Sequence, residues 1–255
     1  MMEYGHGGDT YRNRNVELDF SVNVNPLGMP NFVWEAAQRS IAFCTGYPDS
    51  SCENLRGRLS EITGVPEDQM IFGNGAAELI FRLVQEVRPK KAVIPAPSFA
   101  EYETALRSCG TEIAFFYLKE AESFFLNISE FLDFLRAEQP EIIFLCTPAN
   151  PTGAMIRQAD LSKILDYCRK HGILLVLDEC FVEFLDEERS CGCICEFLDW
   201  ETGRPEHGGS LFLLRAFTKT YAMAGLRLGY GFCTSRELLE RMEENWQPWS
   251  VSIPA

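Results

Sequence analysis

A lysine and an arginine stand eight residues apart at the end of an apolar segment. Lys219 follows the apolar run 211–214 and is flanked by two threonines. A lysine amine that is withdrawn from water becomes a nucleophile that forms Schiff bases with carbonyl compounds. Arg227 lies between two glycines in the segment 225–229, where its guanidinium suits a phosphate group. Taken alone, the two residues could equally be ordinary basic side chains at a strand end.

A carboxylate pair, Asp178 and Glu179, ends a second apolar run at residues 174–177. A buried aspartate is unfavourable by several kcal/mol unless a cation meets it. Asp178 therefore predicts a cationic partner, which either the protein or a cofactor could supply.

Three other apolar runs also end in residues that can bind a ligand. The glycine turn at residues 73–78 joins a strand to a helix, and the free N–H groups at the start of that helix can hold an anion. Asn150 lies in an Asn-Pro-Thr-Gly segment, and Phe99 follows Pro97-Ser98 and offers an aromatic face. Five such elements, all at strand ends, indicate one common site.

The elements that must position these residues follow from the apolar pattern. Continuous apolar runs predict strands that are buried on both faces, and the amphipathic segments between them predict helices. We predict strands at 70–72, 92–94, 113–116, 142–145, 174–177 and 211–214, and helices at 31–43, 51–63, 76–86, 160–170 and 237–244. Strand and helix in alternation indicate an α/β fold with a mainly parallel sheet, helices on both faces and a ligand at the carboxyl ends of the strands.

The ordered set of motifs resembles the fold-type I pyridoxal-phosphate (PLP) enzymes, the aspartate-aminotransferase superfamily, over essentially the whole chain. The resemblance implies the seven-stranded large domain of that superfamily, with PLP as cofactor. Lys219 would form the Schiff base with PLP, and Asp178 would pair with the pyridinium nitrogen. Asn150 would hydrogen-bond the 3′-oxygen of the ring, and Phe99 would stack on the ring. A carboxylate beside the ring nitrogen keeps it protonated, which makes the ring an electron sink.

The resemblance also implies a phosphate site and a dimer. The backbone at Gly75, Ala76 and Ala77 would bind the cofactor phosphate together with Thr218 and Arg227. Tyr47 would reach that phosphate from a partner subunit of a homodimer. Phe181 departs from the pattern, because many relatives have a tyrosine there that binds the 3′-oxygen.

Within the superfamily, residues 18–28 and 47–49 resemble the histidinol-phosphate aminotransferase branch. The opening segment His6-Gly7-Gly8 resembles the arm of the threonine-phosphate decarboxylases of cobalamin synthesis, in which it lies near the substrate phosphate. A mobile N-terminal histidine is the alternative interpretation. The resemblance implies that His6, Gly7, Gly8 and Asn25 bind the substrate.

The chain is predicted to divide into an N-terminal arm at 1–65, a PLP-binding domain at 66–245 and the start of a further region at 246–255. These families carry a C-terminal small domain with the arginine that binds the substrate carboxylate. We expect that domain to be missing here, since the chain stops at Ala255 where it should begin.

Composition limits the class of protein. The 255 residues are 46% hydrophobic and carry a formal net charge of −14, which excludes global disorder and disfavours nucleic acid and anionic membrane surfaces as partners. No apolar run approaches the ~20 residues of a membrane helix, and the N-terminus does not resemble a signal peptide. We therefore expect a soluble, cytoplasmic chain.

Ten cysteines could indicate disulfides or a metal site. Cys146, Cys168 and others lie inside apolar or helical patterns, as reduced cysteines of cytosolic proteins do. Cys191, Cys193 and Cys195 alternate, with His207 further along, but no second pair with zinc-ligand spacing follows. The pattern favours a loop of small residues, and we expect no metal.

Three functions fit these residues. The first is a PLP lyase that decarboxylates L-threonine O-3-phosphate to 1-amino-2-propanol phosphate. The second is a histidinol-phosphate-type aminotransferase that uses the same residues. The third is a PLP-binding module that lacks turnover because the carboxylate-binding region is absent.

Overall fold

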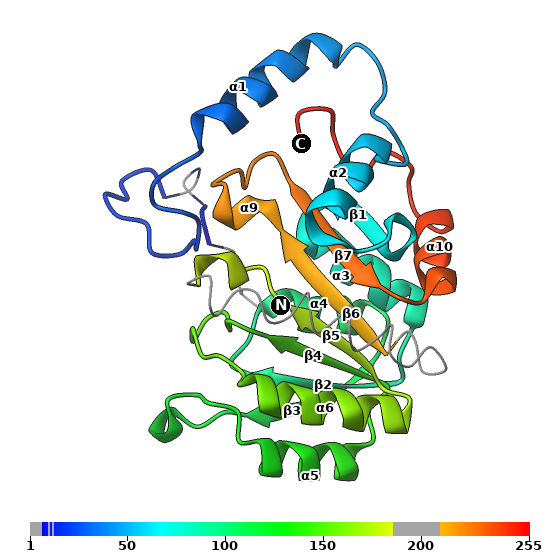
Figure 1. Ribbon diagram of the computed structural model, residues 1–255. Coiled ribbons are helices and arrows are strands. Elements are labelled where there is room, and N and C mark those ends of the chain that lie inside the picture. Colours follow the sequence, from blue (N-terminus) through cyan, green and yellow to red (C-terminus); the bar gives the residue numbers. More distant parts are fainter. Residues whose placement is uncertain (1–6, 10, 12, 186–209) are drawn as a thin grey trace.

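The computed structural model describes residues 7–9, 11, 13–185 and 210–255, and its centre is a seven-stranded sheet (Figure 1). The strand order is β1-β7-β6-β5-β4-β2-β3. The strands are β1 (Met70–Asn74), β2 (Lys91–Ala96), β3 (Glu112–Tyr117), β4 (Ile142–Cys146), β5 (Leu174–Asp178), β6 (Leu211–Ala216) and β7 (Leu228–Cys233). Only β7 runs antiparallel to its neighbours, β1 and β6, so the sheet is mainly parallel as expected.

Helices precede the sheet and connect its strands. The α-helices are α1 (Asn31–Ser40), α2 (Glu53–Thr63), α3 (Gly75–Val87), α4 (Ala100–Ser108), α5 (Ile128–Glu138), α6 (Gln158–His171), α9 (Phe217–Thr220) and α10 (Arg236–Glu244). Short 3₁₀ turns are η1 (Ile41–Phe43), η2 (Glu67–Gln69), η3 (Glu120–Glu122) and η4 (Val182–Phe184). Every strand and helix that the apolar pattern predicts is present, whereas β7, α4, α5 and the short helix α9 are not among the predicted elements.

The sheet separates two hydrophobic cores. Along β5, Leu175 and Leu177 pack into the core beneath α5 and α6, whereas Val176 packs into the core beneath α3 and α4. Figure 1 shows α5 and α6 together on one side of the sheet. Because each strand is covered on both faces, its apolar run is continuous rather than alternating.

The N-terminal part of the chain packs less closely. Helix α1 contains no buried residue, and Phe32 and Trp34 on it are 65% and 54% exposed. The segment before α1 is attached through Asn25, whose backbone N–H donates to the carbonyl of Lys219 at 3.0 Å. The Asn25 side-chain amide donates to the carbonyl of Thr220 at 2.9 Å. This arm therefore meets the rest of the molecule at the predicted lysine.

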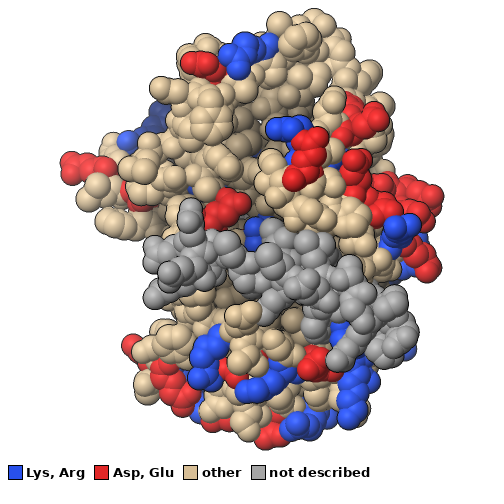
Figure 2. All heavy atoms as spheres, in the orientation of Figure 1, with Lys and Arg blue, Asp and Glu red and all other residues tan. Residues whose placement is uncertain are grey.

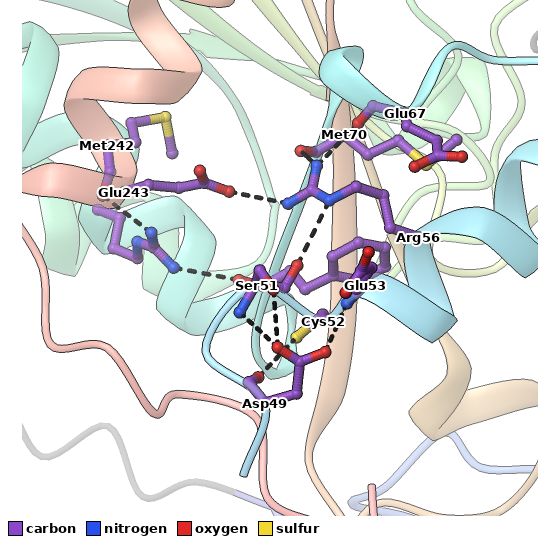
Figure 3. Close-up of polar contacts among 11 residues, drawn as sticks. Asp49, Ser51, Cys52, Glu53, Arg56, Glu67, Met70, Met242 and Glu243 are labelled. Atoms are coloured by element: carbon purple, nitrogen blue, oxygen red, sulfur yellow. Dashed lines mark hydrogen bonds and ion pairs between the residues drawn. The ribbon is translucent and has the colours of Figure 1, made fainter.

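Arg56 of α2 fixes the edge strand β1 (Figure 3). Its guanidinium donates to the carbonyls of Glu67 and Met70, at 2.8 and 2.5 Å, and forms an ion pair with Glu243 of α10 at 3.0 Å. Since β1 leads directly into α3, these contacts also set where α3 begins.

Charged side chains lie mainly on the outer surface. Acidic residues gather over α10 in Figure 2, where that helix carries Glu237, Glu240, Glu243 and Glu244. Among the described residues, no helix is both long and apolar enough to cross a membrane. No group of histidine, cysteine or acidic side chains that could hold a metal is found in this described part. Cys44, Cys52, Cys109, Cys146, Cys168 and Cys180 form no disulfide. Cys191, Cys193, Cys195 and His207 lie outside the described residues.

Candidate functional site

One pocket at the carboxyl ends of the strands collects almost all of the predicted cofactor residues. It is lined by Gly75, Ala76, Ala77, Phe99, Cys146, Asn150, Asp178, Cys180, Phe181, Ala216, Thr218, Lys219 and Arg227. Every residue predicted to bind the cofactor is in this set except Tyr47. The strand order explains the convergence, because β4, β5 and β6 are adjacent and end side by side.

The start of α3 forms one end of the pocket, together with Arg227. Gly75 has φ +78°, and a Cβ atom there would lie 2.5 Å from Nη2 of Arg227. Gly229 of β7 allows an equally close approach, because a Cβ atom there would lie 2.3 Å from the backbone nitrogen of Ala76. The positive φ favours glycine at 75, and a side chain at 229 would strike the backbone of α3, so Arg227 and β7 both lie close against the helix start.

Arg227 is itself held in an uncommon conformation. Its φ is +64°, which is rare for a residue with a side chain. Its guanidinium donates to the carbonyls of Asn74 and Ala224, both at 3.2 Å. A positive group beside the first N–H groups of a helix makes this end of the pocket an anion site.

Asp178 also lines this pocket, and it is buried. Its Oδ2 accepts a hydrogen bond from the Tyr102 hydroxyl at 2.6 Å, and its Oδ1 accepts one from the Cys180 backbone N–H at 2.9 Å. Within the described residues, no lysine or arginine forms an ion pair with Asp178. The described residues therefore do not supply the cation that a buried aspartate predicts.

Glu179, the next residue, is paired within the protein. Its carboxylate forms a buried ion pair with Arg215 of β6, with N–O distances of 2.7 and 3.0 Å to Oε2. Burial alone would lower the pKa of Arg215, but the Glu179 charge and hydrogen bonds offset burial and raise that pKa overall. This pair belongs to the framework of the site, because neither residue lines the pocket.

Lys219 lies in α9, the single helical turn that follows β6. Its side chain lines the pocket, and its backbone carbonyl accepts the Asn25 N–H described above. The described residues place no hydrogen-bond acceptor or carboxylate against its amine in this structure. The amine is therefore available to a ligand in the pocket.

The model of the aminotransferase class I and II family matches residues 15–255. The chain belongs to this family. A threonine-phosphate decarboxylase from Salmonella typhimurium is 37% identical over 240 residues, which are 93% of this chain and 62% of that protein. A histidinol-phosphate aminotransferase from Methanosarcina barkeri is 32% identical over 237 residues, 91% of this chain and 59% of that protein.

A solved structure agrees with the sequence relatives. The histidinol-phosphate aminotransferase from Clostridium acetobutylicum superposes with a TM-score of 0.77 at 26% identity, covering 92% of this chain and 66% of that one. The chain thus spans about three fifths of the length of the two curated relatives. The seven-stranded fold expected from the resemblance is confirmed.

Two phenylalanines form the aromatic wall of the pocket. Phe99 directly precedes α4, and its ring meets the Tyr102 ring edge to face, with centroids 5.6 Å apart. Phe181 lines the pocket from the turn after β5. Asn150 reaches the same pocket from the loop after β4.

Several predicted residues lie elsewhere. Tyr47 is 79% exposed and stacks on Trp249 with centroids 4.4 Å apart, outside this pocket. Gly7 and Gly8 also lie outside it. They pack against Ser21 and Val22, and the Gly8 N–H donates to the Ser21 hydroxyl at 2.8 Å.

Asn25 lies close to the pocket through its contacts with Lys219 and Thr220, although it does not line the cavity. His6 lies outside the described residues.

Three residues near Asp178 escaped the sequence analysis as site residues. Tyr102 is buried in α4, whereas Cys146 and Cys180 line the pocket. Burial, and after it the charge of Asp178, raises the pKa of each of these three groups. A tyrosine three residues after Phe99 is the signal that could have indicated Tyr102, because positions i and i+3 share one face of a helix.

Proposed function

We propose that the pocket binds PLP and that the chain is the cofactor-binding part of an enzyme acting on a phosphorylated amino acid. The observation that carries this proposal is the convergence of three groups in one cavity. Within the described residues, these are a lysine without an ion-pair partner, a buried aspartate without a cation, and an arginine at a helix start. Family membership supports the choice of cofactor.

The residues fit PLP at each of its polar positions. Arg227, the first N–H groups of α3 and Thr218 would hold the phosphate, since an anion is favoured at a helix start and by a guanidinium. Asp178 would accept the ring N–H, and Phe99 would cover one face of the ring. Asn150 would donate to the 3′-oxygen.

When bound, PLP supplies an electron sink for the electron pair that remains on the substrate α-carbon after a bond to that carbon breaks. Asp178 would stabilise positive charge on the ring nitrogen. Lys219 would hold the cofactor before the substrate arrives, and its released amine would then be placed to return a proton to the α-carbon. The bond held perpendicular to the ring decides whether carbon dioxide or a proton leaves.

Decarboxylation of L-threonine O-3-phosphate to 1-amino-2-propanol phosphate, a step of cobalamin synthesis, is the proposed reaction. The Salmonella relative, a threonine-phosphate decarboxylase, supports it. We further propose that His6, Gly7, Gly8 and Asn25 bind this substrate. The Asn25 contact with Lys219 supports a place for the arm beside the pocket.

A histidinol-phosphate-type aminotransferase is the second candidate, and the Methanosarcina relative favours it. The same lysine would then remove a proton from the α-carbon instead of returning one after decarboxylation. A module that binds PLP without turnover is the third candidate.

Product analysis separates the three candidates. The chain, and a form extended past Ala255 to the length of its relatives, would each be given L-threonine O-3-phosphate or histidinol phosphate with 2-oxoglutarate. Mass detection of 1-amino-2-propanol phosphate without glutamate supports the decarboxylase. Glutamate together with the ketone formed from the substrate amine supports the aminotransferase, and bound PLP without either product supports the third candidate.

The lysine assignment has its own test. Borohydride reduction of the PLP-loaded protein should fix the cofactor covalently to the peptide that contains Lys219, and Lys219→Ala should abolish this label. Lys163→Ala is a matched control, because Lys163 lies on α6 and pairs with Asp160. A label that survives Lys219→Ala contradicts the assignment.

We also propose a cytoplasmic homodimer in which Tyr47 serves the cofactor phosphate of the partner subunit. Its exposed ring outside its own pocket supports this, as do the exposed apolar side chains of Phe20, Leu27 and Phe32. Light scattering should give a dimer with PLP bound, whereas a PLP-bound monomer would contradict the shared site. The division into an arm at 1–65, a PLP domain at 66–245 and a further region from 246 is part of the same proposal.

A further inference from the structure

Tyr102 is held rigidly behind the pocket. It is 1% exposed, and its ring stacks on Phe144 of β4 with centroids 4.9 Å apart and an interplanar angle of 22°. The Phe99 ring packs against it edge to face. Packing on both neighbours leaves the hydroxyl little freedom of direction.

That hydroxyl is a neutral donor to Asp178. The Oη–Oδ2 distance of 2.6 Å is typical of a strong hydrogen bond to a charged acceptor. Burial, and next the charge of Asp178, raises the pKa of Tyr102 well above its usual range, so the hydroxyl keeps its proton. The Cys180 N–H holds the other carboxylate oxygen.

Other titratable groups also lie around Asp178, and the Cys180 thiol makes a hydrogen bond with it. Cys146 faces it from β4 and Cys180 from the turn after β5, and burial raises the pKa of both thiols. Lys219 of α9 lies in the same pocket but forms no ion pair with Asp178 among the described residues. Among the described residues, Tyr102 donates a short hydrogen bond of 2.6 Å to Oδ2 of this carboxylate.

We infer that Tyr102 is a positioning residue that keeps the shared proton on the cofactor ring nitrogen rather than on Asp178. This inference rests on the proposed binding of PLP. A donor to the charged form of a carboxylate stabilises that form and makes the carboxylate a weaker proton acceptor. Without the Tyr102 hydroxyl, Asp178 competes better for the proton, and the ring becomes a poorer electron sink.

The test removes only the hydroxyl. Tyr102→Phe keeps the stacked ring, and Tyr230→Phe is the matched control, since it removes another buried tyrosine hydroxyl, from β7, outside the pocket lining. PLP labelled with ¹⁵N in the ring is bound to each protein, and the nitrogen chemical shift reports whether the ring nitrogen carries the proton. The shift should move toward the unprotonated value in Tyr102→Phe and stay unchanged in Tyr230→Phe.

Affinity gives a second readout that needs no turnover. The hydrogen bond from Tyr102 to Asp178 lies within the protein, so Tyr102→Phe should change the affinity for PLP only through Asp178, by about tenfold. An analogue with carbon in place of the ring nitrogen cannot share a proton with Asp178, so the same substitution should change its affinity less than about twofold.

The outcomes separate this inference from the proposal beneath it. An unchanged nitrogen shift in Tyr102→Phe, or equal loss of affinity for PLP and for the analogue, would contradict a role of Tyr102 in placing the proton. Tyr102 would then contribute only packing. Loss of PLP binding with the analogue still bound would support it. Failure of the wild-type chain to bind PLP through Lys219 would instead overturn the proposed function.

Discussion

Asp178 and Glu179 are neighbours at the end of β5, yet Asp178 accepts its hydrogen bonds from neutral donors and Glu179 accepts them from a buried arginine. Asp178 faces the pocket, whereas Glu179 faces β6 and does not line the cavity. Among the described residues, the fold thus pairs the Glu179 charge with a cation but not the Asp178 charge. A carboxylate pair that looks uniform in sequence separates into a framework residue and a site residue.

Removing the arginine that pairs with Glu179 should have the largest effect on stability. Arg215→Met should lower the free energy of unfolding by about 3–5 kcal/mol, because it leaves the buried Glu179 charge without its partner. Urea titration measures this loss. Arg241→Met is the control, since the Arg241 side chain is 44% exposed in its pair with Glu86 and its removal should cost far less. Equal losses in the two variants would show that the buried pair has no special role.

Substitution of Asp178, which lines the pocket, should lower the turnover rate rather than the stability of the fold. Asp178→Asn is nearly isosteric, so the thermal midpoint should change little. Turnover should fall about 10³-fold, which corresponds to ~4 kcal/mol of transition-state stabilisation. Both quantities are to be measured on a form that turns over substrate. Near-normal turnover with a large drop in the midpoint would mean that Asp178 only stabilises the local turn.

The fold could be predicted wherever apolar residues form continuous runs. Strand β7 escaped prediction because Gly229 and Gly231 interrupt its run. Both glycines have packing reasons, since a Cβ atom at 229 would meet the start of α3 and one at 231 would lie 2.6 Å from the Phe212 ring. In β7, the close approach of neighbouring groups requires glycine, and the glycines interrupt the apolar run from which a strand is predicted.

The site could be predicted where a polar residue follows a strand, as for Lys219 and Asp178. Tyr102 could not, because it lies inside a helix and its hydroxyl meets a residue 76 positions away. The orientation of Glu179 was equally inaccessible, because alternation along a strand separates two neighbours but does not say which face holds the ligand. Such pairings depend on strand order, which an apolar pattern leaves open.

Removing both charges of the Glu179–Arg215 pair should restore much of the unfolding free energy that is lost when Arg215 alone is removed. The double variant Glu179→Gln with Arg215→Met should lie within about 1–2 kcal/mol of the wild type in unfolding free energy, since no uncompensated charge remains buried. Urea titration of both single variants and the double completes the cycle. A double variant as unstable as Arg215→Met alone would show that lost packing, not charge, causes the instability.

The smallest effect concerns the thiols beside Asp178. Burial, and after it the Asp178 charge, raises the pKa of Cys180 and of Cys146, so both thiols stay protonated at neutral pH although they line the pocket. Because the thiolate is the reactive form, iodoacetamide should label them at least about tenfold more slowly than the exposed Cys44. Mass spectrometry of labelled peptides measures the three rates.

Asp178→Asn then separates the two causes. Burial is the larger cause for both thiols, so removing the carboxylate charge should raise their labelling rates only modestly and leave Cys44 the fastest. Rates that become equal to that of Cys44 in the Asn variant would show that the charge, and not burial, keeps the thiols protonated. The same variant would then report how strongly the unbalanced carboxylate acts on its neighbours, which is the property that distinguishes Asp178 from Glu179.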